Sequence, residues 1–202
     1  MFCGAQLSLY PMTDRFVDLI LQAIEVFKRT EGIRLETDDL STCVIGPPQK
    51  VFQVAEGLFQ SAALTGVHVV LNALFSRGCP GEPEDPLCTP CTPEGPAKEI
   101  ELINLSDLAQ TGIQVAAQYS LYPLGTENYM NLIYQQIDQA KQEGTYGGGK
   151  HFATRLEGDL AQVFATLYNA FTRTSRLTGH VVIHATLSAN SPTNTKKNKE
   201  NK

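Results

Sequence analysis

The four residues Ser-Leu-Tyr-Pro occur twice in this chain, at positions 8–11 and 120–123, and both copies follow an Ala-Gln pair. The displacement of 112 residues extends the match. Residues 5–12 and 31–80, compared with 117–124 and 143–192, share 19 identities in 58 positions. Unrelated segments would share roughly 3–5 identities over that length, so the two segments are copies of one unit. The chain is therefore a tandem duplication, and its fold must be built twice.

The repeat divides the 202 residues into two units with a connecting segment and a tail. We place the first unit at residues 1–80 and the second at residues 114–192. Residues 81–113 are rich in proline and acidic side chains, which predicts an extended linker. The polar, basic residues 193–202 predict a disordered tail. A unit of about 80 residues buries a limited core, so we expect the units to pack on each other or on a second chain.

Hydrophobic periodicity predicts the same element order in both units. In the first unit, residues 6–10 alternate between polar and apolar as a half-buried strand does, and apolar residues then recur at helical spacing from Phe16 to Phe27. A hairpin, a second helix and a long strand follow, at residues 33–38 and 40–45, after Gly46, and at 67–77. The second unit has strands at 117–122 and 180–188, a helix near 126–143, a glycine-rich hairpin, and a helix capped by Asp159.

The order βαββαβ predicts an α+β unit with a four-stranded antiparallel sheet and both helices on one face, the ferredoxin-like or ACT-like arrangement. Strand alternation predicts which side chains face the helices: Val69, Leu71, Ala73 and Phe75, and Val181, Ile183, Ala185 and Leu187. The opposite sheet face then mixes polar side chains with a tyrosine in each unit. Such a surface suits a small polar ring compound or a partner sheet.

Two short motifs point to chemistry, and neither has the required context. Gly144 to Lys150 has the glycine and lysine spacing of a phosphate-binding loop, but it follows a predicted helix and enters a strand, the reverse of the needed order. Cys88 and Cys91 have metal or redox spacing, without a second pair or a nearby histidine. Neither unit combines a nucleophile, a base and an orienting carboxylate in a readable motif. We therefore expect no enzyme, no catalytic residue, no metal and no cofactor.

The charge and the N-terminal sequence limit which classes of partner and which location we expect. The net charge is −5 although the tail adds four lysines and one glutamate, and such an acidic body argues against a nucleic-acid partner. No signal-like segment opens the chain, and no run approaches the roughly 18 apolar residues of a membrane span. The five cysteines are an odd number and do not suggest a disulfide framework. We expect a cytoplasmic protein.

With both repeats in view, the chain resembles the YkoF family of thiamin/hydroxymethylpyrimidine-binding proteins. The residues that carry the resemblance in the first unit are Cys3 to Gln6, Ser8 to Asp14, Ser41-Thr42, Asn72, Ser76 and Gly78 to Gly81. In the second unit they are Leu121 to Pro123, Tyr129-Met130, Gly144-Thr145, His151 and Leu187 to Pro192. The chain departs from the family pattern in its linker and at Asp39, where we expect a histidine.

The resemblance implies a tandem ferredoxin-like protein that forms a homodimer and binds thiamin or its hydroxymethylpyrimidine moiety, one site per repeat, without catalysis. It also implies a link to uptake or salvage of the pyrimidine precursor, with a membrane transporter as a partner. An aminopyrimidine needs donors, acceptors and a flat contact surface. We predict ligand-binding residues Ser8, Tyr10, Thr42, Asn72 and Ser76 in the first unit, and Tyr122, Thr154, His184, Ser188 and Asn190 in the second.

Three other interpretations remain open. An ACT-type regulatory module would sense an amino acid or another small metabolite, and would respond to a ligand with an amine and a carboxylate. A small ferredoxin-like enzyme would need an acid/base residue in a deep pocket, for which His184 is the candidate. A purely structural interaction protein would respond to no small molecule.

Overall fold

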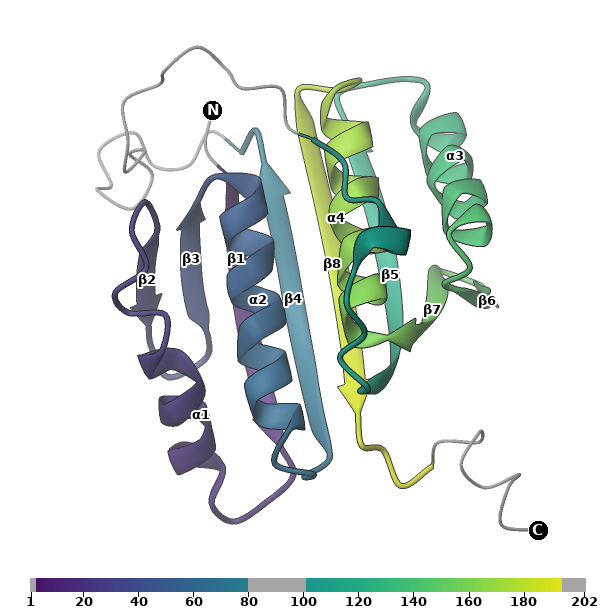
Figure 1. Ribbon diagram of the computed structural model, residues 1–202. Coiled ribbons are helices and arrows are strands. Elements are labelled where there is room, and N and C mark those ends of the chain that lie inside the picture. Colours follow the sequence, from purple (N-terminus) through teal and green to yellow (C-terminus); the bar gives the residue numbers. More distant parts are fainter. Residues whose placement is uncertain (1–2, 80–100, 194–202) are drawn as a thin grey trace, which may run out of the picture.

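The computed structural model describes residues 3–79 and 101–193 (Figure 1). Most of the predicted linker, including Cys88 and Cys91, and nearly all of the predicted tail lie outside the described residues. Within the described ranges, no helix is long and apolar enough to cross a membrane.

Each repeat has the predicted order of elements. The first consists of β1 (Cys3–Pro11), α1 (Phe16–Glu25), β2 (Arg34–Thr37), β3 (Thr42–Gly46), α2 (Pro48–Ala63) and β4 (Val69–Arg77). The second consists of β5 (Gln114–Leu124), α3 (Tyr129–Gln142), β6 (Tyr146–Lys150), β7 (Ala153–Asp159), α4 (Leu160–Ser175) and β8 (His180–Ala189). A short 3₁₀ helix, η2 (Leu105–Asp107), precedes the second repeat.

Local chemistry explains where the second helix of each repeat begins. Pro48 occupies the first turn of α2, where its missing N–H costs no hydrogen bond. In α4, the side chain of Asp159 accepts a hydrogen bond from the Ala161 N–H at 3.1 Å, so the predicted cap is confirmed.

The two repeats share one antiparallel sheet of eight strands, in the order β2-β3-β1-β4-β8-β5-β7-β6. All four helices lie on one face of this sheet (Figure 1). The predicted fold class, a tandem repeat of two ferredoxin-like βαββαβ units, is therefore confirmed. The repeats join edge to edge, because β4 pairs with β8 along their whole length.

The β4–β8 register shows that this junction is a pseudo-twofold axis. Ala73 lies opposite Ala185, and these two residues are also equivalent under the 112-residue displacement. The two paired strands are thus equivalent strands of the two repeats, as at the self-complementary interface of a symmetric dimer. Asn72 and His184, which are equivalent as well, contact each other beside this axis.

The core lies between the sheet and the helices. The eight residues predicted to face the helices are all buried, with at most 1% of their surface exposed. Phe52 of α2 stacks on Phe75 with ring centroids 4.0 Å apart, and it also contacts Tyr168 and Phe171 of α4. Aromatic pairs of this kind contribute about 0.5–1.5 kcal/mol beyond their buried area. Packing between α2 and α4 thus reinforces the junction of the repeats.

The segment before β5 is held against α4 by buried polar side chains. Asn169 is fully buried, and its amide both donates to the Ile103 carbonyl and accepts from the Ile103 N–H, each at 2.8 Å. The Asp159 carboxylate also accepts from the N–H groups of Thr111 and Gly112, at 3.1 and 2.9 Å. Residues 101–113 are therefore fixed to the second repeat.

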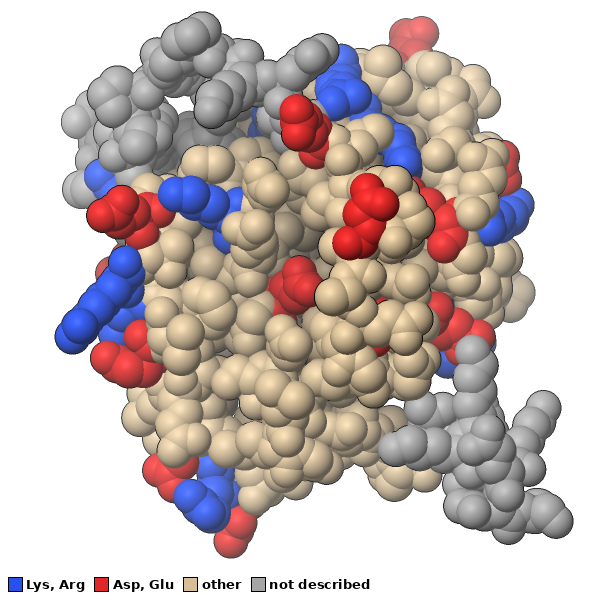
Figure 2. All heavy atoms as spheres, viewed as in Figure 1, with Lys and Arg blue, Asp and Glu red and all other residues tan. Residues whose placement is uncertain are grey.

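The helix-covered face has an uneven charge distribution. Much of the surface over α2 is uncharged, and lysine and arginine side chains gather toward the outer edges (Figure 2). The described part of this face presents no continuous basic surface of the kind that binds nucleic acid.

Candidate functional site

Each repeat contains a cavity at the same place, between its first strand, its first helix and the tip of its hairpin. The first cavity, of about 100 Å³, lies between β1, α1 and the β2–β3 tip. The second, of about 680 Å³, lies between β5, α3 and the β6–β7 tip. Equivalent residues line the two cavities, among them Leu9 and Leu121, Ile20 and Ile133, Ile24 and Ile137, and Thr42 and Thr154. The isoleucine pairs are 113 residues apart, because the first helix is shifted by one residue between the repeats.

The sheet leaves a gap at each of these places. Pairing between β1 and β3 stops at Leu7 opposite Thr42, and pairing between β5 and β7 stops at Tyr119 opposite Thr154. The strand residues that follow have no strand neighbour on that side within the described residues. Backbone N–H and C=O groups at such an edge need partners, which a bound molecule can supply.

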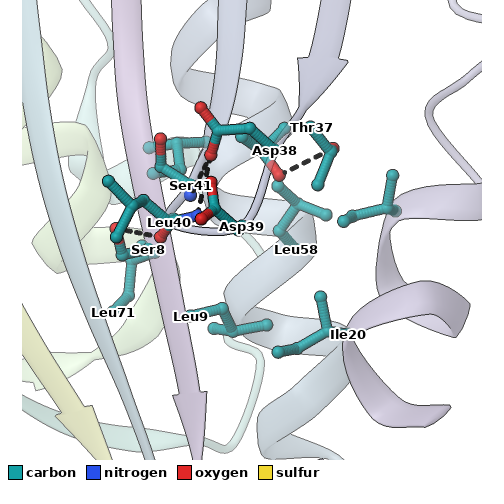
Figure 3. Close-up of a pocket in the computed structure, with 13 residues that line it drawn as sticks. Ser8, Leu9, Ile20, Thr37, Asp38, Asp39, Leu40, Ser41, Leu58 and Leu71 are labelled. Atoms are coloured by element: carbon teal, nitrogen blue, oxygen red, sulfur yellow. Dashed lines mark hydrogen bonds between the residues drawn. The ribbon is translucent and has the colours of Figure 1, made fainter. Parts of the chain in front are cut away.

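A serine hydroxyl ties each hairpin tip to the first strand. Ser8 donates to the Leu40 carbonyl at 3.1 Å, and Ser120 donates to the Phe152 carbonyl at 3.0 Å. Figure 3 shows the first of these contacts among the residues that line the cavity, with the apolar side chains of Leu9 and Ile20 lower in the view. This shared hydrogen bond gives a physical reason for the repeated Ser-Leu-Tyr-Pro sequence.

The difference in size follows from substitutions between the repeats. Leu58 of α2 lines the first cavity, and its equivalent in α4 is the small, buried Ala170. Thr37 on the first hairpin is replaced by Gly149 on the second. Both changes remove side-chain volume from the second repeat. A volume near 700 Å³ is in the usual range for a small-molecule site, whereas the first cavity is smaller.

The lining of the second cavity includes Tyr119, whose hydroxyl is buried. Burial raises the pKa of the Tyr119 hydroxyl to about 12, with Glu143 adding to the shift and Thr154 opposing it. The hydroxyl is therefore protonated at neutral pH. Thr154 is the neighbour close enough to act on this hydroxyl, but their contact does not have good hydrogen-bond geometry. A buried donor without a partner is costly, and a ligand acceptor would satisfy it.

Exposed aromatic side chains surround the mouth of the second cavity. They are Tyr122, Tyr129, Tyr134 and Phe152. Phe152, at the hairpin tip, has 96% of its surface exposed. A large apolar side chain in that position gains nothing from water, and it offers a flat contact for a ring.

The charged groups at the two mouths have opposite signs. The first hairpin tip carries Asp38 and Asp39, and the equivalent positions of the second carry Lys150 and His151. Asp38 accepts hydrogen bonds from the Leu40 and Ser41 N–H groups, both at 2.8 Å. These bonds lower the pKa of Asp38, which is therefore ionised at neutral pH.

Comparison with known proteins agrees with this duplicated architecture. A family model described as the YKOF-related family matches residues 2–82 and again residues 114–194, one match per repeat. The chain belongs to the YkoF-related family. The chain is also 35% identical over 191 residues to a Bacillus subtilis (strain 168) protein named "Putative HMP/thiamine-binding protein YkoF", covering 94% of this chain and 90% of that protein.

Four of the ten predicted ligand-binding residues line the cavities of this YkoF-related chain. Ser8 and Thr42 line the first cavity, and Tyr122 and Thr154 line the second. Thr42 is buried and shares a hydrogen bond with Thr37 at 3.0 Å. Their role in binding remains a prediction.

The other six predicted residues lie elsewhere. Tyr10, Ser76 and His184 are on the sheet face that no helix covers, where Asn72 contacts both the His184 ring at 3.0 Å and the Thr186 hydroxyl at 3.3 Å. On the same face, Ser188 contacts the His68 ring at 3.1 Å, which joins the repeats. Asn190 follows β8 and donates to the carbonyls of Ala63 and Val67, so it fixes the end of α2.

Sequence reasoning missed the helix and the hairpin as cavity walls. The sequence placed Ile20, Ile24, Ile133 and Ile137 only on an apolar stripe of the first helix in each repeat. Their signal was present in the repeat, since both pairs are identical residues at equivalent helix positions. The Tyr119 hydroxyl carried no such signal, because its equivalent in the first repeat is Leu7.

Proposed function

We propose that this chain binds thiamin or its hydroxymethylpyrimidine moiety, one ligand in each of the two equivalent cavities. The observation that carries the proposal is the second cavity. It combines about 680 Å³ of space, the buried Tyr119 in its lining and exposed aromatic rings at its mouth. The name of the Bacillus subtilis relative supports the same ligand class.

The chemistry of an aminopyrimidine suits this arrangement. Its ring nitrogens accept hydrogen bonds, its amino group donates them, and its faces are flat and apolar. Tyr119 can donate to a ring nitrogen, and the unpaired edge of β5 can bond the amino group. Tyr122 and Phe152 offer ring faces at the mouth.

The proposal is binding without chemical conversion. The relative is named as a binding protein, which supports this choice. We further propose that the chain acts as a homodimer in the cytoplasm, in uptake or salvage of the pyrimidine precursor, beside a membrane transporter. The uncovered sheet face supports the homodimer, because it leaves Tyr10 50% exposed and Leu74 40% exposed.

Isothermal titration calorimetry with thiamin, with hydroxymethylpyrimidine and with a panel of amino acids tests the proposal. We expect saturable heat with both pyrimidine compounds and none with the amino acids. Tyr119→Phe removes one hydroxyl and should weaken binding at the second site by about 3- to 10-fold, the worth of one hydrogen bond.

The matched control is Tyr168→Phe, which removes a hydroxyl bonded to the Glu101 carbonyl, away from both cavities. It should leave the affinity unchanged. Heat with an amino acid alone would favour an ACT-type sensor instead. An unchanged affinity in Tyr119→Phe would place the ligand outside the second cavity.

A further inference from the structure

We propose that the two cavities select their ligands by charge. The first accepts the cationic or neutral form of the pyrimidine ligand, and the second accepts a phosphorylated, anionic form as well. The inference rests on the proposed function and adds a division of labour between the two sites. It is carried by charge inversion at equivalent positions and by the difference in volume.

The inversion lies on the hairpin tips, which both repeats hold in place by the same serine hydrogen bond. Asp38 and Asp39 line the first mouth, and Lys150 and His151 stand at the equivalent places of the second. Since the tips are anchored alike, the two pairs of side chains line their cavities at the same place in each repeat. The first mouth therefore repels a phosphate, and the second attracts one.

The surroundings do not cancel this difference. The residues that line the first cavity include no lysine or arginine, and those that line the second include no carboxylate. Within the described residues, no carboxylate lies within salt-bridge distance of Lys150. Glu143, which raises the pKa of Tyr119, is paired with Arg173 at 2.8 Å. Lys150 is thus available to an anion.

Space favours the same assignment. A phosphate ester on the hydroxymethyl group adds a tetrahedral group, for which the first cavity, of about 100 Å³, offers less room. The second cavity has about 680 Å³. Gly149 precedes Lys150 on the second tip and has no side chain to fill the space beside the lysine. The equivalent residue of the first repeat is Thr37.

One charge at such a mouth has a measurable effect. At about 5 Å from the ligand phosphate, and with an effective dielectric constant of about 50 for a half-exposed site, it changes the affinity by about tenfold. Salt weakens this contribution, because the screening length is about 8 Å at physiological ionic strength. The ester should therefore bind with clear salt dependence, and neutral hydroxymethylpyrimidine without it.

Calorimetry on the full chain, with neutral hydroxymethylpyrimidine, its phosphate ester and thiamin, tests the proposal. We expect the neutral compound to bind at two sites per chain and the ester at one. Lys150→Gln should weaken the ester by about tenfold and leave the neutral compound unchanged. Asp39→Asn should weaken thiamin, whose thiazolium is a cation, at the first site. The control substitutions Arg29→Gln and Glu36→Gln remove exposed charges that line neither cavity.

The outcomes distinguish charge selection from pyrimidine binding itself. If the ester binds at both sites with the affinity of the neutral compound, or if Lys150→Gln leaves ester binding unchanged, charge selection is wrong while pyrimidine binding stands. If no pyrimidine compound binds wild-type protein, the proposed function is wrong and charge selection falls with it. A thermal melt of each variant confirms that it folds, as expected for exposed positions.

Discussion

Glu56 gives this fold a pH dependence that one substitution should remove. Its side chain lies half-buried on α2, beside Phe164 and Leu108, in a small cavity facing the start of α4. Burial raises the pKa of this carboxyl from 4.5 to about 7, and the Asp159 carboxylate adds to the shift. The protein therefore keeps Glu56 protonated at a pH where the unfolded chain would ionise it.

The sign and the size of the effect follow from proton linkage. Between pH 4.5 and about 7 the folded state binds more protons at Glu56 than the unfolded state, so stability falls as the pH rises through this window. A shift of about 2.5 units corresponds to at most about 3.4 kcal/mol. Because Glu56 is only partly buried, solvent screening reduces this to about 1–2 kcal/mol. Above pH 7 the full decrease in the free energy of unfolding is reached.

Glu56→Gln keeps the shape of the side chain and removes the ionisation. We expect the variant to be more stable than wild type by about 1–2 kcal/mol at pH 8 and by less than about 0.5 kcal/mol at pH 5. Urea unfolding at the two pH values measures both differences. Glu36→Gln, at an exposed position on β2, is the control of the same type. An equal difference at pH 5 and pH 8 would refute the assignment of the effect to Glu56 ionisation.

Three further substitutions test the fold and the cavities. Asn169→Leu leaves the Ile103 N–H and carbonyl without partners and should lower the free energy of unfolding by about 2–3 kcal/mol, measured by urea unfolding. Gly78→Ala should lower it by about 2–4 kcal/mol in the same assay, because residue 78 has a φ of +89° and the new Cβ would lie 2.0 Å from the Gly179 carbonyl oxygen. Ser120→Ala releases the second hairpin tip from β5, so hydrogen exchange at the tip should speed up about fivefold, while an unchanged rate would show that the hydroxyl does not hold it.

The fold could be predicted from the sequence because the repeat and the hydrophobic periodicity agree. Alternation alone placed Leu71 and Ile183 on the helix side, and both are fully buried. The boundaries of the strands were less accurate: residues 117–122 were predicted, and β5 spans Gln114–Leu124. The added residues pair with β7 and β8, which are distant in the sequence. Local periodicity carries no information about such pairing.

The candidate site was harder to predict, because its position depends on where pairing ends. Alternation placed Ser8 and Asn72 on one sheet face together, and they do lie opposite each other on adjacent strands. The cavity, however, opens only because β3 stops pairing with β1 at Leu7, so Ser8 lines it while Asn72 bonds across the junction of the repeats. A strand end is set by the hairpin and by packing, and a single sequence does not encode it in its periodicity.

The duplication explains how one chain can keep two equivalent cavities and let them differ. What both repeats retain is the frame: the serine tie from the first strand to the hairpin tip, and the isoleucines on the first helix. What they change is what a ligand would meet: Leu58 against Ala170 for volume, and Asp38 against Lys150 for charge. The shared serines bond the backbone of the hairpin tips and the shared isoleucines pack on the helix side of the sheet, so substituting them would lower the stability of either repeat. The tip residues are exposed and bear no such cost, which leaves them free to specify the ligand.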